Sequence, residues 1–314
     1  MALDFVCPNC QARTLVPDEF LGQSGPCFSC GKTVTVPINA AVMTTAAGPR
    51  PVDAAKVRAR QARRRNLFNV VGLVFAGVFS LGLTVALALL IAIPAIRAAR
   101  NARSSANCST QLSRIAAAIR QYQAVYGVYP PAYIAGADGK PMHSWRVLIL
   151  PQLGESSLYS RYKFEEPWDS QNNMMVARQM PAVYACDTDT LARDQHETSY
   201  LVPVGGKTMF PKGKSRTLPE IKDGTNNTLL VVESHGTGVL WTEPADLPVS
   251  NLHFGSTKKS GGGPSLSSGH EDGVHIVTVD GEVFLVPTDT PAEVMTALST
   301  VAGQEVIPWE LLGK

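Results

Sequence analysis

The chain has 314 residues and a formal net charge of +2. This length accommodates about two domains, and the small net charge excludes the strongly basic composition typical of proteins that bind nucleic acid through charge alone. Basic residues outnumber acidic ones before residue 66, and acidic residues outnumber basic ones after it. A basic arm before an apolar segment favours contact with an anionic membrane surface.

Two C-x2-C pairs lie near the N-terminus, Cys7 with Cys10 and Cys27 with Cys30. Four thiolates from two tight turns can surround a tetrahedral Zn²⁺ ion, and this spacing is typical of a zinc ribbon. Each pair is followed by a Val-Pro dipeptide, which predicts two paired half-ribbons over residues 1–38. The alternative, two disulfides, requires an oxidising compartment. We interpret the zinc as structural, because four cysteine ligands leave no open position for catalysis.

The ribbon has no evident surface of aromatic and basic residues, so we expect no nucleic-acid partner. So small a unit buries too little apolar surface to fold without its ion. Residues 39–65 are predicted to form a linker, rich in Ala, Thr and Pro at first, and then a basic juxtamembrane segment.

An apolar segment without a charged residue runs from Asn66 to Ile96. As a helix it would be about 45 Å long, against roughly 30 Å of hydrocarbon in a bilayer. Core helices of soluble domains rarely stay apolar on every face for so long, and a cleaved signal peptide has a shorter apolar region. Residues 66–96 are therefore predicted to be a transmembrane helix, with a kink at Pro94.

The charges beside this segment predict its orientation, because Lys and Arg are retained on the cytoplasmic side. More basic residues precede the segment than follow it, so we expect a cytoplasmic N-terminus and an extracytoplasmic C-terminal domain. The residues before it are Lys56, Arg58, Arg60, Arg63, Arg64 and Arg65, and those after it are Arg97, Arg100 and Arg103.

The helix is predicted to continue beyond the lipid as an amphipathic helix. Gly127 suits the position after a helix end, and the prolines at 130 and 131 exclude further helix. Cys186 either pairs with Cys108 in a disulfide or both remain buried thiols. The apolar stripe of this helix consists of Cys108, Leu112, Ile115, Ile119, Tyr122 and Tyr126, which recur at helical steps.

The remaining sequence predicts a mainly antiparallel sheet. The dipeptide Asp280-Gly281 predicts a two-residue hairpin turn with positive φ at both positions, and Thr290 to Glu293 predicts a capping box that opens a helix through about Leu298. Residues 255–269 are rich in Gly and Ser and are expected to form a flexible loop. The expected strands are Ser199–Val204, Thr228–Glu233, Gly238–Trp241, Val274–Val279 and Glu282–Val286, while Trp145–Leu153 is compatible with helix or strand.

The predicted fold class is thus α+β, with one long N-terminal transmembrane and amphipathic helix packed on a mainly antiparallel sheet, preceded by a small zinc ribbon. Residues 97–314 form the large domain in this prediction.

Several short motifs follow one another between about Ile93 and Val306: Pro94-Ala-Ile-Arg-Ala-Ala-Arg, Cys108-Ser-Thr-Gln-Leu-Ser-Arg-Ile-Ala-Ala-Ala-Ile-Arg-Gln-Tyr, Tyr129-Pro-Pro-Ala-Tyr, His143-Ser-Trp-Arg-Val, Glu166-Pro-Trp-Asp, Asp223-Gly-Thr-Asn-Asn-Thr and Trp241-Thr-Glu-Pro-Ala-Asp. In this order they resemble a large paralogous planctomycete family of unknown function, described as pseudopilin-like (PulG-like). Its closing H-x9-DG signature corresponds here to His270 and Asp280-Gly281. The resemblance implies a pilin-like long helix and sheet, without an established activity.

The N-terminal side departs from that family. No prepilin-type cleavage site precedes Leu67, and no Glu lies within residues 66–96. We therefore expect the chain to keep its N-terminus and the helix to act as a permanent anchor, rather than as a subunit of a pilus.

No catalytic residue is predicted. His270 and Asp280 invite a catalytic interpretation, but an Asp-Gly dipeptide suits a tight turn, and a histidine beside a loop can simply bond to that loop. The other histidines lack the spacing of metal ligands, and no nucleophile elbow, phosphate loop or dinucleotide motif is present. We expect no enzyme activity, no small-molecule substrate and no cofactor besides the zinc.

Three functions remain open from the sequence. The leading one is a membrane-anchored protein with a structural, assembly or protein-interaction role, whose partners are the lipid bilayer and other proteins. The second is an extracytoplasmic module that binds a ligand for transport or sensing, which a large apolar pocket would favour. The third, a hydrolase, requires His270, Asp280 and a nearby carboxylate to converge in a cleft.

Overall fold

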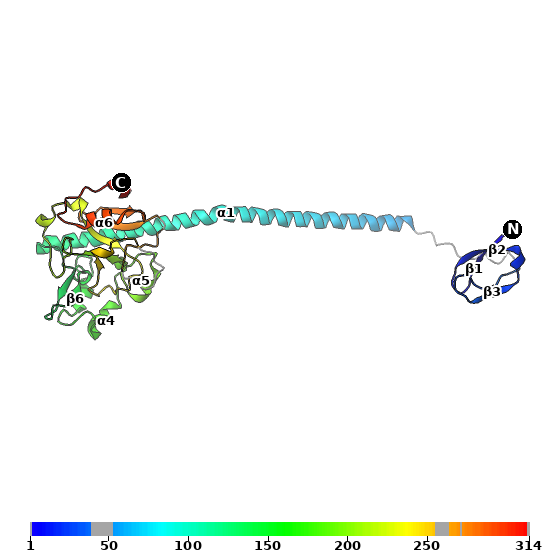
Figure 1. Ribbon diagram of the computed structural model, residues 1–314, viewed down its shortest axis with the longest axis horizontal. Coiled ribbons are helices and arrows are strands. Elements are labelled where there is room, and N and C mark those ends of the chain that lie inside the picture. The colour runs from blue at the N-terminus through cyan, green and yellow to red at the C-terminus, as the bar shows by residue number, and fades with distance from the viewer. Residues whose placement is uncertain (1, 39–52, 255–263, 271, 313–314) are drawn as a thin grey trace. The chain divides into compact units, whose positions relative to one another are not determined.

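The computed structural model describes residues 2–38, 53–254, 264–270 and 272–312. Most of the predicted linker (39–52) and of the Gly-rich segment (255–263) lies outside the described residues. The chain forms two compact units, Met1–Leu87 and Ala88–Lys314. One continuous helix, α1 (Ala54–Tyr126), contributes residues to both units (Figure 1).

The first unit contains two antiparallel hairpins, one for each half of the repeat seen in the sequence. Strand β1 (Ala2–Val6) pairs with β2 (Arg13–Pro17), and β3 (Ser24–Pro26) pairs with β4 (Thr33–Thr35). In both hairpins a residue of positive φ follows the second cysteine, Gln11 at 61° and Gly31 at 69°. In each hairpin the N–H of this residue donates to the carbonyl of the first cysteine of the pair, at 2.8 Å. The core is very small and consists of Phe5, Cys7, Cys27 and Val36.

Helix α1 changes character along its length. Over the apolar segment its large side chains are exposed, as shown by Phe75 at 71% and Leu90 at 73%. This is a helix long and apolar enough to cross a membrane. Further on, the predicted stripe is fully buried from Cys108 to Ile119, whereas Tyr122 is half-buried and Tyr126 is exposed. The helix ends as predicted, because Gly127 takes a φ of 75° and its N–H bonds to the carbonyl of Gln123.

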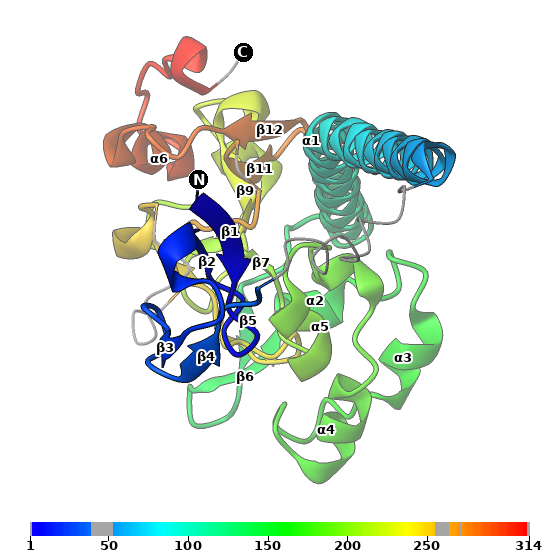
Figure 2. The ribbon, with the colours of Figure 1, turned by 90° about the vertical axis from the view of Figure 1, so that its right-hand side faces the viewer.

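The main sheet of the second unit has four antiparallel strands in the order β12-β11-β9-β7 (Figure 2). Residues on one face of this sheet, among them Leu230 and Val277, pack in the same hydrophobic core as the buried stripe of α1. Residues on the other face, among them Ile276, pack in a second hydrophobic core with α6 (Ala292–Ser299). This confirms the α+β class with one long helix on an antiparallel sheet. The strands are β7 (Tyr200–Leu201), β9 (Leu229–Glu233), β11 (Val274–Thr278) and β12 (Val283–Val286).

Short elements surround this centre. They are β5 (Tyr133–Ala135), β6 (Pro141–Ser144), α2 (Trp145–Leu148), α3 (Ser156–Arg161), α4 (Gln171–Ala177), α5 (Thr190–Gln195), β8 (Pro203–Val204) and β10 (Leu247–Pro248). Strand β5 pairs with β6, and β10 pairs with β8 in parallel.

Two predicted strands differ from the structure. Residues 238–241 form no strand, because Gly236 and Gly238 take positive φ and leave only an isolated bridge between Leu240 and Glu197. The predicted strand 199–204 is divided into β7 and β8 at Val202, whose N–H donates to a carboxylate instead of a strand.

Two predicted turn features are also wrong in detail. Of Asp280 and Gly281, only Gly281 takes a positive φ, at 96°. The N–H of Gly281 donates to the carbonyl of Thr278 and the N–H of Thr278 to that of Glu282, which indicates a longer loop with a bulge rather than a two-residue turn. The capping box is absent as well: α6 begins at Ala292 without a side-chain cap, and the Thr290 hydroxyl donates to Leu311 instead.

A buried ion pair connects α2 to the segment before β10. Arg146 and Asp246 have side chains 0% and 2% exposed, and the guanidinium donates to Asp246 Oδ1 at 2.6 Å. The same carboxylate accepts from the Trp145 indole and from the N–H of Val202. The remaining N–H groups of Arg146 bond to the carbonyl of Tyr200 and to Ser144. Every part of this network therefore has a partner, as buried charges require.

We expect the substitution Asp246→Ala to lower the free energy of unfolding by about 3–5 kcal/mol, because it leaves a buried guanidinium without its counter-ion. The matched control is Lys140→Ala, which removes an ion pair whose side chains are 82% and 58% exposed and should cost less than about 1 kcal/mol. Denaturant titration of the full chain in detergent, followed by tryptophan fluorescence, measures both. Equal losses of unfolding free energy in the two variants would contradict the role of Asp246 as the counter-ion of a buried guanidinium.

Candidate functional site

The four N-terminal cysteines lie close enough together to hold a metal ion. Their sulfurs are all within 4.8 Å of one another, with Cys7 to Cys30 at 3.8 Å and Cys10 to Cys27 at 3.7 Å. Sulfurs in a tetrahedron about 2.3 Å from a zinc ion are roughly 3.8 Å apart. The spacing therefore fits a tetrahedral thiolate site for a cation of that size.

The second hairpin turn favours the thiolate form of one of these cysteines, Cys27, whereas for Cys30 a backbone hydrogen bond from Lys32 is outweighed by burial and by the neighbouring thiols, which raise its pKa to about 11. Hydrogen bonds from the backbone N–H groups of Cys30 and Ser29 lower the pKa of the Cys27 thiol. A thiolate is the form that binds metal ions. All four cysteines are free of disulfides.

The other two cysteines, Cys108 and Cys186, form a disulfide with Cα atoms 5.4 Å apart. This decides between the two alternatives left open by the sequence. Both residues are fully buried, and the bond ties α1 to the segment before α5. Closing a loop of 78 residues contributes roughly 4 kcal/mol in the chain-entropy model.

Beside this disulfide lies a buried carboxylate surrounded by three histidines. Glu233 stands at the end of β9 and is completely buried. Its Oε2 is 3.0 Å from the backbone nitrogen and 3.0 Å from Nδ1 of His275. Its Oε1 is 2.9 Å from Nε2 of His235 and 3.6 Å from Nε2 of His270. We call Glu233, His235, His270 and His275 the histidine cluster.

The cluster keeps its carboxylate ionised. Burial by itself raises the pKa of Glu233, but hydrogen bonds from His235 and His275 outweigh it and lower the pKa to about 2. For His270, burial is the largest effect and lowers the pKa, so this imidazole is neutral near pH 7. The cluster thus combines a charged carboxylate with a neutral imidazole that can donate or accept.

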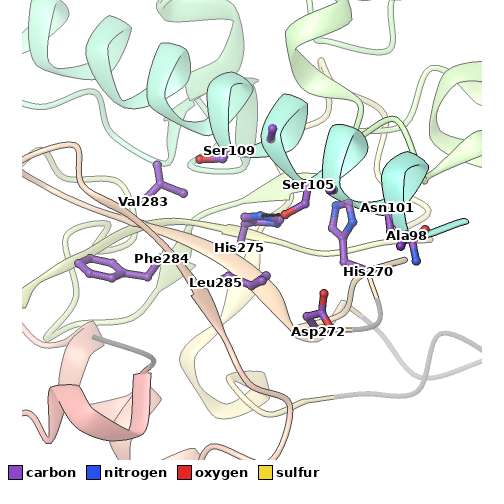
Figure 3. Close-up of a pocket in the computed structure, with 12 residues that line it drawn as sticks. Ala98, Asn101, Ser105, Ser109, His270, Asp272, His275, Val283, Phe284 and Leu285 are labelled. Carbon is purple, nitrogen blue, oxygen red and sulfur yellow. Dashed lines mark hydrogen bonds between the residues drawn. The ribbon is translucent and has the colours of Figure 1, made fainter. Parts of the chain in front are cut away.

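A cavity of about 620 Å³ opens beside the cluster, between α1 and the hairpin of β11 and β12 (Figure 3). His270, His275 and Asp272 line it, and Ser105 of α1 lies 3.0 Å from Nε2 of His275. The α1 side is otherwise made of small residues, namely Ala98, Asn101, Ala102, Ala106 and Ser109.

The residues marked by the closing motif of the sequence do not meet. His270 lines the cavity beside the cluster, whereas Asp280 lines a different one that includes Arg120. The carboxylate of Asp280 accepts from Thr278 and from the N–H of Glu282, which fixes the hairpin loop. The trio that a hydrolase would require, His270 and Asp280 with another carboxylate, is therefore not assembled.

Glu233 is a possible acid/base group from the sequence, but the sequence does not place it together with His235 and His275. The signal was weak, because these residues are spread over two strands and a turn rather than placed at helical spacing. The polar residues interrupt apolar runs, Glu233 after Leu-Leu-Val-Val and His275 inside Val-His-Ile-Val. A charged residue that ends a buried strand is the only hint that a partner lies on a neighbouring strand.

Residues 97–210 match the model of a protein family described as "Protein of unknown function (DUF1559)". This part of the chain is similar to that family. The matched residues contain the buried half of α1, Arg146 and both disulfide cysteines, and they end before Asp246 and Glu233. No curated protein and no solved structure matches the chain.

We expect the substitution Glu233→Gln to reduce the acid sensitivity of the second unit. A pKa lowered in the folded state gives stability that is complete above the ordinary value of 4.5 and is lost as the pH falls through about 2. Wild-type stability should therefore fall more steeply over this range than that of the variant, as measured by denaturant titrations at several pH values. The exposed Glu310→Gln serves as control and should keep the wild-type slope.

We expect the ribbon to bind one transition-metal ion per chain through Cys7, Cys10, Cys27 and Cys30. Cys10→Ser should remove the ion, which elemental analysis of purified, non-reduced protein measures. Phe28→Ala, which changes a 95% exposed side chain between two of the cysteines, should retain it. Full metal content in Cys10→Ser would contradict the four-thiolate site.

Proposed function

We propose that this chain is a single-pass membrane protein with a cytoplasmic zinc ribbon and an extracytoplasmic, pseudopilin-like domain that makes structural or assembly contacts with other proteins. The observation that carries the proposal is the different state of the cysteines in the two units. The first unit contains four free, converging thiols, and the second contains a disulfide. A charge-free apolar segment of α1 separates them in the sequence.

The two cysteine states favour different compartments. Disulfides persist in oxidising spaces outside the cytoplasm, whereas thiols remain reduced inside it and bind metal ions there. The excess of basic residues before the apolar segment supports the same orientation. Zinc is the cation proposed for the ribbon, because four thiolates in a tetrahedron suit its charge and its lack of geometric preference.

The exposure of α1 supports insertion into lipid. Along 66–96 the large apolar side chains pack against nothing in the described part of the chain. An apolar surface of this extent is unfavourable in water and is typical of an interaction with lipid or protein. A bilayer covers all faces of the helix at once, which agrees with the absence of a polar face.

A role in assembly is supported by the positions of the other motif residues, which lie in the interior of the second unit or fix its C-terminal segment. Trp145, Arg146 and Asp246 belong to motifs quoted for the family resemblance, and they build the interior rather than a cleft. Another such residue, Asp223, accepts from the N–H groups of Gly303 and Gln304 and from the Thr300 hydroxyl, and so fixes the C-terminal segment. We accordingly propose no catalytic activity, and protein partners rather than nucleic acid.

A second candidate function is ligand binding by the second unit. The cavity beside the histidine cluster favours it, because three titratable side chains line a space large enough for a small molecule. The lining is of mixed polarity rather than apolar, which favours a polar ligand.

Thiol labelling in cells tests the proposed orientation. A membrane-impermeant maleimide should leave the wild-type chain unlabelled in intact cells, and should label the ribbon thiols after permeabilisation with a chelator. The variant Lys212→Cys places an exposed thiol on the second unit and should be labelled in intact cells. Labelling of the ribbon thiols without permeabilisation would contradict the orientation.

The partner role is tested in the same cells by crosslinking. An impermeant crosslinker should join the second unit to a reproducible set of proteins. A chain lacking residues 1–40 should lose those partners that depend on the ribbon, while the point variant Phe28→Ala controls for a general loss of expression. An outer domain without reproducible crosslinked partners would contradict the assembly role and leave ligand binding as the better proposal.

A further inference from the structure

Four potential metal ligands from distant parts of the sequence converge at the histidine cluster. The sulfurs of Cys108 and Cys186, a carboxylate oxygen of Glu233 and a ring nitrogen of His270 all lie within 4.8 Å of one another. The His270 Nε2 is 3.5 Å from the Cys186 sulfur and 3.6 Å from Glu233 Oε1. This convergence is separate from the ribbon and belongs entirely to the second unit.

The carboxylate is already oriented toward this point. Both bonds from His275 reach Oε2, and within the described residues the hydrogen bond to Oε1 comes from His235. An ionised carboxylate oxygen accepts about two hydrogen bonds, so Oε1 keeps a lone pair beside His270. Such outer histidines hold a ligating carboxylate in place in metal sites.

His270 is likewise suited to be a ligand. Its side chain is 3% exposed, and its ring stands at 85° to that of His275, with centroids 4.9 Å apart. Its Nε2, rather than Nδ1, faces the sulfur and the carboxylate. A metal ion needs the neutral imidazole with a free ring nitrogen.

We propose that Cys108, Cys186, Glu233 and His270 bind a thiophilic divalent cation such as Zn²⁺ when the disulfide is open. The site then has two exclusive states, a disulfide without the ion and a dithiolate that holds it. Two sulfurs, one nitrogen and one oxygen form a complete tetrahedral set for zinc.

The conversion between the states balances in two steps. A dithiol reductant transfers two electrons and two protons to the S–S bond, which breaks into two thiols while the reductant itself closes to a disulfide. Zn²⁺ then forms two S–Zn bonds as the thiols release two protons, and it takes one lone pair each from His270 and Glu233. Sulfurs about 2.3 Å from zinc are roughly 3.8 Å apart, so the pair only has to separate locally.

A cavity reaches His270, one of the four proposed ligands. The cavity between α1 and the β11–β12 hairpin is lined by His270, and Ser105 on α1 lies one turn before Cys108. Asp272 at the same cavity adds a negative charge that attracts a cation.

Metal counting on the full chain in detergent tests the proposal. The reduced protein, kept without oxygen in excess phosphine, should bind one more Zn²⁺ per chain than the oxidised protein. With Co²⁺ as probe, a chain carrying Cys27→Ser and Cys30→Ser should gain a sulfur-to-cobalt absorption band on reduction only. His270→Ala should weaken this binding by at least about tenfold. The matched control, His253→Ala, removes an exposed histidine and should leave it unchanged.

Three results would overturn the proposal. One is equal Zn²⁺ uptake by the oxidised and reduced chains, and another is a His270→Ala variant that binds the metal ion with wild-type affinity. The third is loss of the folded second unit on reduction, which circular dichroism detects, because the site would then have no scaffold. Extra zinc in the reduced wild type, together with its loss in both His270→Ala and Cys108→Ser, supports it.

Discussion

The packing of one stripe of α1 on the β9–β11 sheet is the interaction on which the second unit depends. Cys108, Leu112, Ile115 and Ile119 are fully buried and face the sheet cluster. Because α1 is one continuous helix, the same element carries the apolar segment and the core stripe. The disulfide at Cys108 fixes the segment before α5 to that stripe.

Burial of charge organises the rest of the second unit. Among the buried carboxylates, Asp246 and Glu233 are each satisfied from several elements. Asp246 faces a guanidinium and serves to hold α2 and β7 in place. Glu233 faces three imidazoles, a side-chain type that coordinates cations. The two networks have similar burial. The second borders a cavity and a disulfide, which is why we propose metal binding for it and assign a structural role to the first.

The ribbon is stabilised in a different way from the second unit. Its core contains only four buried side chains, two of them cysteines, so the apolar surface removed from water is too small to offset the entropy of ordering the chain. A metal ion supplies what the core lacks. In the second unit, the large core and one disulfide stabilise the folded state without an ion. The proposed metal site there would consequently affect function more than folding.

Sequence alone determined the features that depend on local pattern. The cysteine spacing indicated the ribbon, the charge-free run indicated the apolar helix, and the 3–4 periodicity after Cys108 predicted the buried stripe, since each is a property of neighbouring residues. Tertiary structure decided what depends on distant pairs. Val202 leaves the strand because Asp246 reaches its N–H, and Glu233 meets His275 because β9 and β11 are paired. Spacing along the chain cannot reveal such contacts, because the side chains are brought together by sheet register and by a disulfide that closes 78 residues.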